Sequence, residues 1–218
     1  MLDMYCFLAG MANLCVPWIL LILWRRRTGA RLLPAPAAFL ICFPVFFIGA
    51  SIRSGFSRGD IYSYYIQQGL LFGILEEGAK YIAMRCIVTS CDSRRDAVSY
   101  GIGHSSYESF GAGLSCLGLI GTGRAASDIF LGNLWGVTTG AVICSAMTVI
   151  IFYGINTNRA KVILPAVMLV HAFLNASGGL FGFSRPIVIL TDIIAGAGIC
   201  FAAYRCWRAM EPPLCDTE

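Results

Sequence analysis

Seven apolar segments dominate the sequence, and each is close to the ~20 residues that an α-helix needs to cross the ~30 Å hydrocarbon core of a membrane. They cover approximately residues 4–24, 34–52, 63–88, 97–120, 129–155, 162–182 and 186–207. Hydrophobic residues make up 57% of the 218 residues and charged residues only 13%, whereas about 45–50% of an ordinary soluble domain is apolar. We therefore predict an all-α fold, a polytopic membrane helix bundle of about seven transmembrane helices. The connections are short, so residues 1–218 are expected to form a single transmembrane domain.

The distribution of basic residues predicts how the chain is oriented in the membrane. Arg25–Arg27 follow the first apolar segment instead of preceding it, so this segment is expected to remain as an uncleaved helix with its N-terminus outside. Counted from there, ten basic residues flank the cytoplasmic side: Arg25, Arg26, Arg27, Arg31, Arg94, Arg95, Arg159, Lys161, Arg205 and Arg208. Four fall outside: Arg53, Arg58, Arg124 and Arg185. This bias predicts a multi-pass protein, in the plasma membrane, with a cytoplasmic C-terminus.

The same distribution argues against a nucleic-acid partner, although the formal net charge is +4. The basic residues form short clusters beside apolar runs, where they act as topology signals, and the sequence contains no nucleic-acid-binding motif. The ten cysteines occur singly and without a CxxC pair, mostly within apolar segments, as Cys42, Cys116 and Cys144 do. They are expected to act as small hydrophobic residues and to form neither a disulfide framework nor a structural zinc site.

Glycine spacing predicts where helices pack closely. The pairs Gly69/Gly73, Gly136/Gly140 and Gly178/Gly182 each place two glycines one turn apart on the same helix face. Small residues at this spacing allow the backbones of membrane helices to approach one another. We therefore expect helix contacts at these three places.

Ionisable and strongly polar residues interrupt three of the apolar segments. An ionisable side chain at the centre of a bilayer costs about 2.5 kcal/mol or more, so such residues face the protein interior and are functional candidates. The residues concerned are Glu76, Glu77, Lys80, His104, Glu108, His171 and Asn175. Within each segment two of them are four residues apart, on one helix face. At ~1.5 Å per residue they lie roughly 10–20 Å from the cytoplasmic ends, whereas Asp192 is shallower from the other side and is left out.

Each of these residues also has a structural interpretation. Lys80 could neutralise one of the glutamates while its side chain extends toward the cytoplasm, and a membrane histidine or Asn175 could simply join two helices by a hydrogen bond. The adjacent Glu76 and Glu77 are harder to explain in this way, because two carboxylates at positions about 100° apart on a helix cannot both face lipid cheaply, and a purely structural role rarely needs both. We therefore predict a functional polar site in a motif-bearing core at about 61–182.

Three motifs resemble those of the glutamic-type intramembrane proteases, a superfamily that includes the CAAX prenyl endopeptidases, the bacteriocin-processing proteins and the PrsW proteases. They are Glu76-Glu77-Gly78-Ala79-Lys80, Gly101-Ile102-Gly103-His104-Ser105-Ser106-Tyr107-Glu108 and His171-Ala172-Phe173-Leu174-Asn175. The Gly-x-Gly-His-x-x-x-Glu element is most similar to the YhfC group. The CAAX branch has arginine where this chain has Tyr81, Lys80 matches the PrsW spacing, and Asn175 is CAAX-like where PrsW has aspartate.

The resemblance implies an intramembrane endopeptidase that acts on a membrane-anchored or lipidated protein or peptide. Glu76 would be the general base that activates a water molecule, supported by Glu77 and Lys80, and His104 would help to hold that water. His171 and Asn175 would stabilise the oxyanion. Glu108 is a further catalytic candidate, and Tyr100, where the CAAX enzymes have phenylalanine, a supporting one. No cofactor is expected in this scheme.

Other interpretations of the same residues remain open. His104 and His171 with Glu108, or Glu77 in its place, could bind zinc and leave one position open for water, although the sequence lacks an HExxH motif. A small ion or proton transporter could use the same buried charges, although such proteins tend to contain inverted repeats, and this sequence shows none. The charged pairs could also join helices in a noncatalytic membrane protein.

Overall fold

The computed structural model describes residues 2–88, 91–122, 127–181 and 184–210, so Arg124 of the orientation argument lies outside the described residues. The described residues form seven α-helices and contain no strand, which confirms the predicted all-α fold. The elements are α1 (Leu2–Thr28), α2 (Pro34–Arg53), α3 (Ile61–Ile82), η1 (Ala83–Ile87), α4 (Arg94–Leu117), α5 (Ser127–Asn156), α6 (Ala160–Leu180) and α7 (Arg185–Ala209). The five residues of η1 form a π-helical turn that continues α3.

Five of the helices, α1, α2, α5, α6 and α7, are long and apolar enough to cross a membrane, as expected for a multi-pass membrane protein. The other two, α3 and α4, have 22 and 24 residues. Their composition is less apolar because they carry Glu76, Glu77 and Lys80 or His104 and Glu108. The two helices that depart most from a membrane composition are therefore two of the three that carry the polar motifs.

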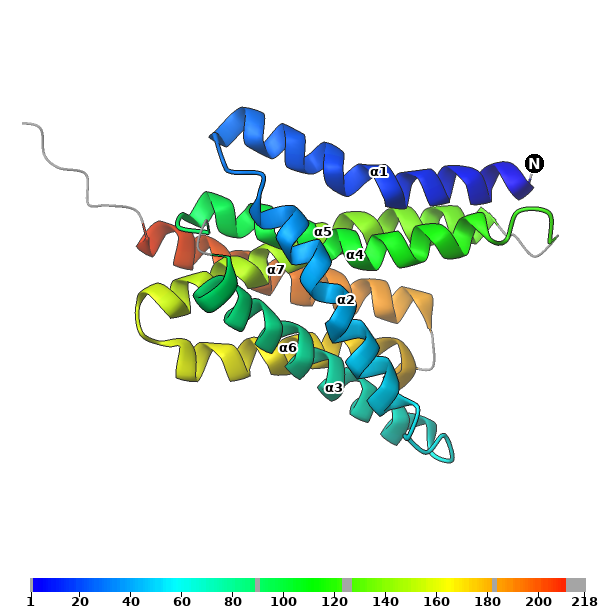
Figure 1. Ribbon diagram of the computed structural model, residues 1–218. Helices are drawn as coiled ribbons and strands as arrows, with labels where there is room; N and C mark the ends of the chain where they lie inside the picture. Colours follow the sequence, from blue (N-terminus) through cyan, green and yellow to red (C-terminus); the bar gives the residue numbers. More distant parts are fainter. Residues whose placement is uncertain (1, 89–90, 123–126, 182–183, 211–218) are drawn as a thin grey trace, which may run out of the picture.

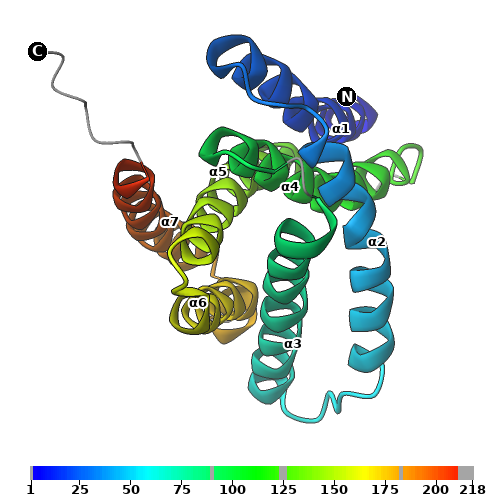
Figure 2. The same ribbon diagram turned by 60° about the vertical axis from the view of Figure 1, so that its left-hand side comes forward.

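Helices α4 and α5 form the centre of the arrangement. They pack against each other, α1 packs on both, α2 packs on α4, and α6 and α7 pack on α5 (Figure 1). Helix α3 lies along α6, and a short loop connects it to α2 (Figure 2). The three motif helices α3, α4 and α6 therefore border a common interior.

The start of α4 is fixed by a capping interaction. Ser93 Oγ accepts a hydrogen bond from the backbone N–H of Asp96 and donates one to Asp96 Oδ2. Asp96 Oδ1 accepts a further bond from the backbone N–H of Arg31 at 2.8 Å. A side chain that bonds an N–H of the first helical turn is typically worth about 1 kcal/mol. Asp96 thus joins the first turn of α4 to the α1–α2 connection, and this contact fixes the position of α4 relative to α2.

Glycines allow α3 to contact the backbone of α6. A Cβ atom added to Gly73 would lie 2.6 Å from the carbonyl oxygen of Met168, and one added to Gly69 would overlap the carbonyl oxygen of Ala172. The contact predicted for Gly69/Gly73 is therefore present. Added Cβ atoms at Gly136 and Gly140 would meet nothing within 4 Å, so that prediction is wrong, and Gly182 lies outside the described residues.

The glycines of the Gly-x-Gly-His motif have the same function in α4. An added Cβ atom would overlap the backbone of Ser145 in α5 at Gly101, and the backbone of Ala35 in α2 at Gly103. One turn of α4 is thus held between two neighbouring helices. This close packing determines where His104, the next residue, projects.

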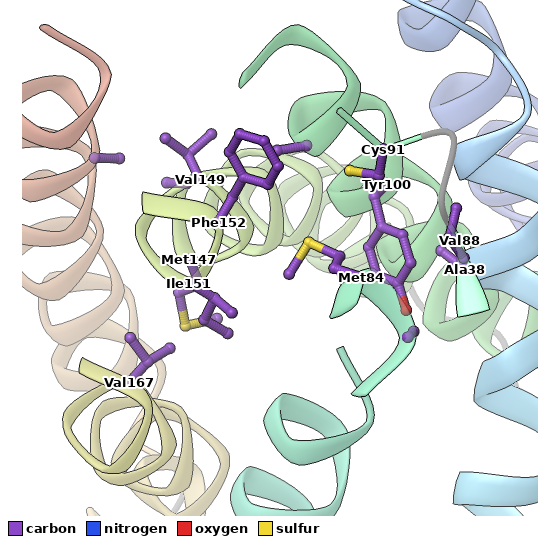
Figure 3. Close-up of a cluster of buried hydrophobic side chains, with 14 of the residues drawn as sticks. Ala38, Met84, Val88, Cys91, Tyr100, Met147, Val149, Ile151, Phe152 and Val167 are labelled. Carbon is purple, nitrogen blue, oxygen red and sulfur yellow. The ribbon is translucent and has the colours of Figure 1, made fainter. Parts of the chain in front are cut away.

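A buried apolar cluster lies beside this turn. Tyr100 is fully buried and packs in the cluster with Met84 of η1 (Figure 3). Met147 and Ile151 of α5 form the other side of the cluster. Tyr100 therefore contributes to the core one turn before His104.

Candidate functional site

Side chains from α3, α4 and α6 meet at Glu76. Its Oε2 atom lies 3.5 Å from His104 Nε2 and 3.4 Å from His171 Nε2. Both distances exceed the usual N–H···O range of about 2.7–3.2 Å. Among the described residues, Glu76 Oε2 and His104 Nε2 are buried and have no hydrogen-bond partner. Three chemically active atoms therefore face one another without bonding directly.

Glu77 forms a separate buried network behind His171. Its Oε1 atom lies 2.6 Å from Lys80 Nζ and 2.5 Å from His171 Nδ1, and Glu77 and Lys80 are both fully buried. A carboxylate that is paired with an ammonium group only accepts hydrogen bonds. Nδ1 of His171 therefore donates to Glu77, and Nε2 lies on the side of the ring that faces Glu76. Lys80 remains inside the protein, so the alternative in which it extends toward the cytoplasm is wrong.

Glu108 borders the same centre from the other side. Its Oε1 atom lies 4.0 Å from His104 Nε2, and its side chain is 45% exposed, compared with 17% for Glu76. Ligand-type atoms of Glu76, Glu108 and His171 all lie within 4.8 Å of one another. Glu108 is therefore more exposed than Glu76 and lies farther from His104.

Two cysteines, both buried as expected of small hydrophobic residues, also lie beside His104. Cys42 Sγ of α2 lies 3.1 Å from His104 Nδ1. Cys144 of α5 is buried, and its sulfur, with one ligand-type atom each of His104 and Glu108, forms a group within 4.8 Å. Nothing in their sequence neighbourhood distinguishes these cysteines from the others, because they approach His104 from other helices.

A groove of about 430 Å³ leads to this centre between α2, α3 and α4. Glu76, Glu108 and Asn175 lie in its wall, and Asn175 is exposed to it. Most of the remaining wall is apolar and aromatic, with Gln68 as a further polar residue. Gln68 is absent from the predicted site residues, although an uncharged amide within an apolar segment is a visible signal in the sequence.

A smaller cavity of about 180 Å³ opens between α5, α6 and α7. It is also lined by Glu108, His171 and Asn175, together with Asp192. Asp192 was left out of the predicted site because of its depth along α7. Its carboxylate borders the same interior, because α7 brings it to the side of α5 that carries Gly136 and Gly140.

Two groups of donor atoms lie close enough together to hold a metal ion: Glu76 with Glu108 and His171, and His104 with Glu108 and Cys144. In a tetrahedral zinc site with bonds of about 2.0–2.1 Å, neighbouring ligand atoms lie about 3.3–3.4 Å apart. The distances from Glu76 Oε2 to the two histidine Nε2 atoms match this spacing. The bond from His171 Nδ1 to Glu77 is the outer-shell contact that orients metal-binding histidines. With the three carboxyl groups ionised and both imidazoles neutral, three carboxylates and one ammonium group carry two excess negative charges, which one divalent cation would balance.

These features define a helical, multi-pass membrane protein with a carboxylate–histidine site inside the bundle. Residues 50–127, or 78 of the 218, match the YhfC intramembrane metalloprotease family. The matched region contains the motifs of α3 and α4, but not His171 and Asn175. The predicted resemblance to the YhfC group is confirmed, and it indicates an intramembrane protease. No curated protein and no solved structure matches the chain.

Proposed function

We propose that this protein is a metal-dependent intramembrane peptidase. The proposal depends mainly on one observation: Glu76 Oε2 lies 3.4–3.5 Å from the Nε2 atoms of His104 and His171 without hydrogen-bonding to either. We assign Glu76, His104 and His171 as the metal ligands. This set differs from the sequence-based alternative, which used Glu108 as the carboxylate ligand. Glu108 is farther from His104 and more exposed, so it is better placed to transfer protons.

A bound zinc-type cation supplies Lewis-acid polarisation of the scissile carbonyl and lowers the pKa of a bound water molecule. Glu108 accepts the proton of the attacking water and returns it to the leaving amine as the C–N bond breaks, which yields a carboxylate and an amine. Asn175 faces the same groove and donates its amide N–H to the developing oxyanion. In this scheme His171 binds the metal through Nε2 instead of stabilising the oxyanion, because its Nδ1 is engaged with Glu77 and its Nε2 lies 3.4 Å from Glu76.

The second candidate is the glutamic mechanism without a metal. It is favoured by the burial of Glu76 between two imidazoles, where a water molecule could occupy the same central position. In that mechanism Glu76 is the base that accepts a proton from this water. The two candidates use the same residues. They differ in whether Glu76 Oε2 and the two histidine Nε2 atoms surround a metal ion or a water molecule.

Metal analysis distinguishes the two candidates. We expect protein purified in lipid nanodiscs to contain about one equivalent of zinc or a related cation after dialysis against a weak chelator. A strong chelator should remove the metal and abolish cleavage of a quenched-fluorescent apolar peptide, and zinc should restore both. Metal-free protein that retains full peptidase activity would support the glutamic mechanism. Protein that neither binds metal nor cleaves peptides would contradict both.

The orientation predicted from the basic residues places the short loop between α2 and α3 outside the membrane. We propose this N-outside orientation for the protein. Only Arg53 and Arg58 are basic near the α2–α3 loop, whereas Arg25–Arg27 lie at the C-terminal end of α1, which is on the opposite side of the membrane in this topology. A phosphatase reporter fused after Gly59 in a bacterial host should be active, and the same reporter fused after Arg31 should be inactive. The reverse pattern would invert the proposed topology.

A further inference from the structure

Two amide side chains in the groove have no bonding partner. Gln68 of α3 and Asn175 of α6 both line it, and neither side chain makes a hydrogen bond to another described residue. The neighbouring Gln67 differs, because its Nε2 atom donates to Ser63 Oγ at 3.0 Å. An unpaired amide in an apolar environment costs about 1–3 kcal/mol by protein mutational data. Gln68 is thus a polar group in an apolar groove that has no hydrogen-bond partner within the described part of the chain.

A peptide that is to be cleaved in the membrane has the complementary requirement. A scissile bond must be unwound before water can attack it, and an unwound backbone in hydrocarbon exposes N–H and C=O groups that each need a partner. An amide side chain offers both a donor and an acceptor, so it can pair with a peptide unit of any sequence. The unpaired amides of the groove therefore match the unpaired backbone of an extended substrate.

The distance between Gln68 and Glu76 along α3 indicates which part of an extended substrate Gln68 can reach. Gln68 precedes Glu76 by eight residues, which is about 12 Å at ~1.5 Å per residue in a helix. An extended peptide rises by about 3.3 Å per residue, so the same distance corresponds to three or four residues of substrate. We propose that Gln68 binds the backbone of an extended, apolar substrate segment three or four residues from the scissile bond. This inference rests on the proposed peptidase function.

The rest of the groove wall indicates which side chains accompany that backbone. Tyr107 of α4 packs edge-on against Phe43 of α2, with ring centroids 4.9 Å apart, and Phe46 lies 6.0 Å from Tyr107. Phe72 and Phe110 complete the aromatic lining. A wall of this kind accepts aliphatic or aromatic side chains and excludes charged ones, because a charge there would lose its hydration without gaining a partner. The substrate class is therefore an apolar membrane segment.

Backbone ester replacement tests the contact. In a series of quenched-fluorescent apolar peptides, one amide at a time is replaced by an ester, which removes a single N–H donor. For the wild-type protein, an ester three or four residues from the cleavage site should lower kcat/KM by about three- to tenfold, the typical effect of one hydrogen bond. Gln68→Leu should lower kcat/KM for the all-amide peptide by a similar factor and make cleavage insensitive to that ester. Gln67→Leu is the matched control and should retain the wild-type ester profile.

Two results would overturn the inference. One is an ester effect at these positions that persists unchanged in Gln68→Leu, and the other is the absence of any effect three or four residues from the cleavage site. If the protein cleaves none of the peptides, the proposed function fails, but the groove can still be tested. A peptide with a photoreactive benzophenone side chain should then cross-link to the α3 segment around Gln68, and labelling elsewhere in the protein would contradict the proposed contact.

Discussion

Glu108→Gln is expected to lower kcat by about 10²–10⁴-fold, the usual contribution of a general acid–base group, while the metal content remains near one equivalent. Glutamine keeps the shape of the side chain but cannot accept the proton of the attacking water. Glu108 lies 4.0 Å from His104 and is 45% exposed, so its neutralisation should leave the proposed ligand atoms in place. Single-turnover cleavage and elemental analysis of the same preparation would measure the two quantities together.

Glu76→Gln provides the contrast. Loss of a charged ligand should weaken metal binding by more than the roughly 10–100-fold that outer-shell substitutions cost, and activity should fall with the metal content. If Glu76→Gln retains the metal while Glu108→Gln loses it, the two glutamates exchange roles, as in the sequence-based alternative with Glu108 as ligand. If neither substitution changes the metal content but Glu76→Gln abolishes cleavage, Glu76 is the base of the glutamic mechanism.

Lys80→Met is expected to destabilise the folded protein by about 3–5 kcal/mol, because it leaves the buried Glu77 carboxylate without its cation. Lys80 and Glu77 are both fully buried, so water cannot replace the lost charge. The change in stability can be measured by denaturant titration in mixed micelles. Lys161→Met, at an exposed position near the start of α6, is the matched control and should change stability by less than about 0.5 kcal/mol.

The double variant Glu77→Gln/Lys80→Met separates stability from function. Removing both charges should restore most of the lost stability, since a buried ion pair can often be replaced by neutral residues at little cost. Activity should remain low, because a neutral amide orients His171 less strongly than the carboxylate does. A double variant with normal activity would show that Glu77 and Lys80 serve stability alone.

The class of fold and the four central residues of the polar site followed from the sequence. Apolar segments of about twenty residues allow little other than membrane helices, because every backbone polar group in hydrocarbon must bond within its own segment. The high cost of an ionisable side chain in that environment made Glu76, Glu77, His104 and His171 recognisable as residues of one interior. Their agreement in depth further restricted them to one level of the bundle, and the structure brings them together.

The arrangement within the site was decided by tertiary contacts that span many residues of sequence. The sequence treats Glu76 and Glu77 as an equivalent pair, but their positions about 100° apart on α3 turn one toward the open centre and the other toward Lys80 and His171. Cys42 and Cys144 approach His104 from α2 and α5 only because Gly103 and Gly101 let those helices contact α4. Spacing within one helix specifies which face a residue occupies, whereas the partner on that face depends on how the helices pack.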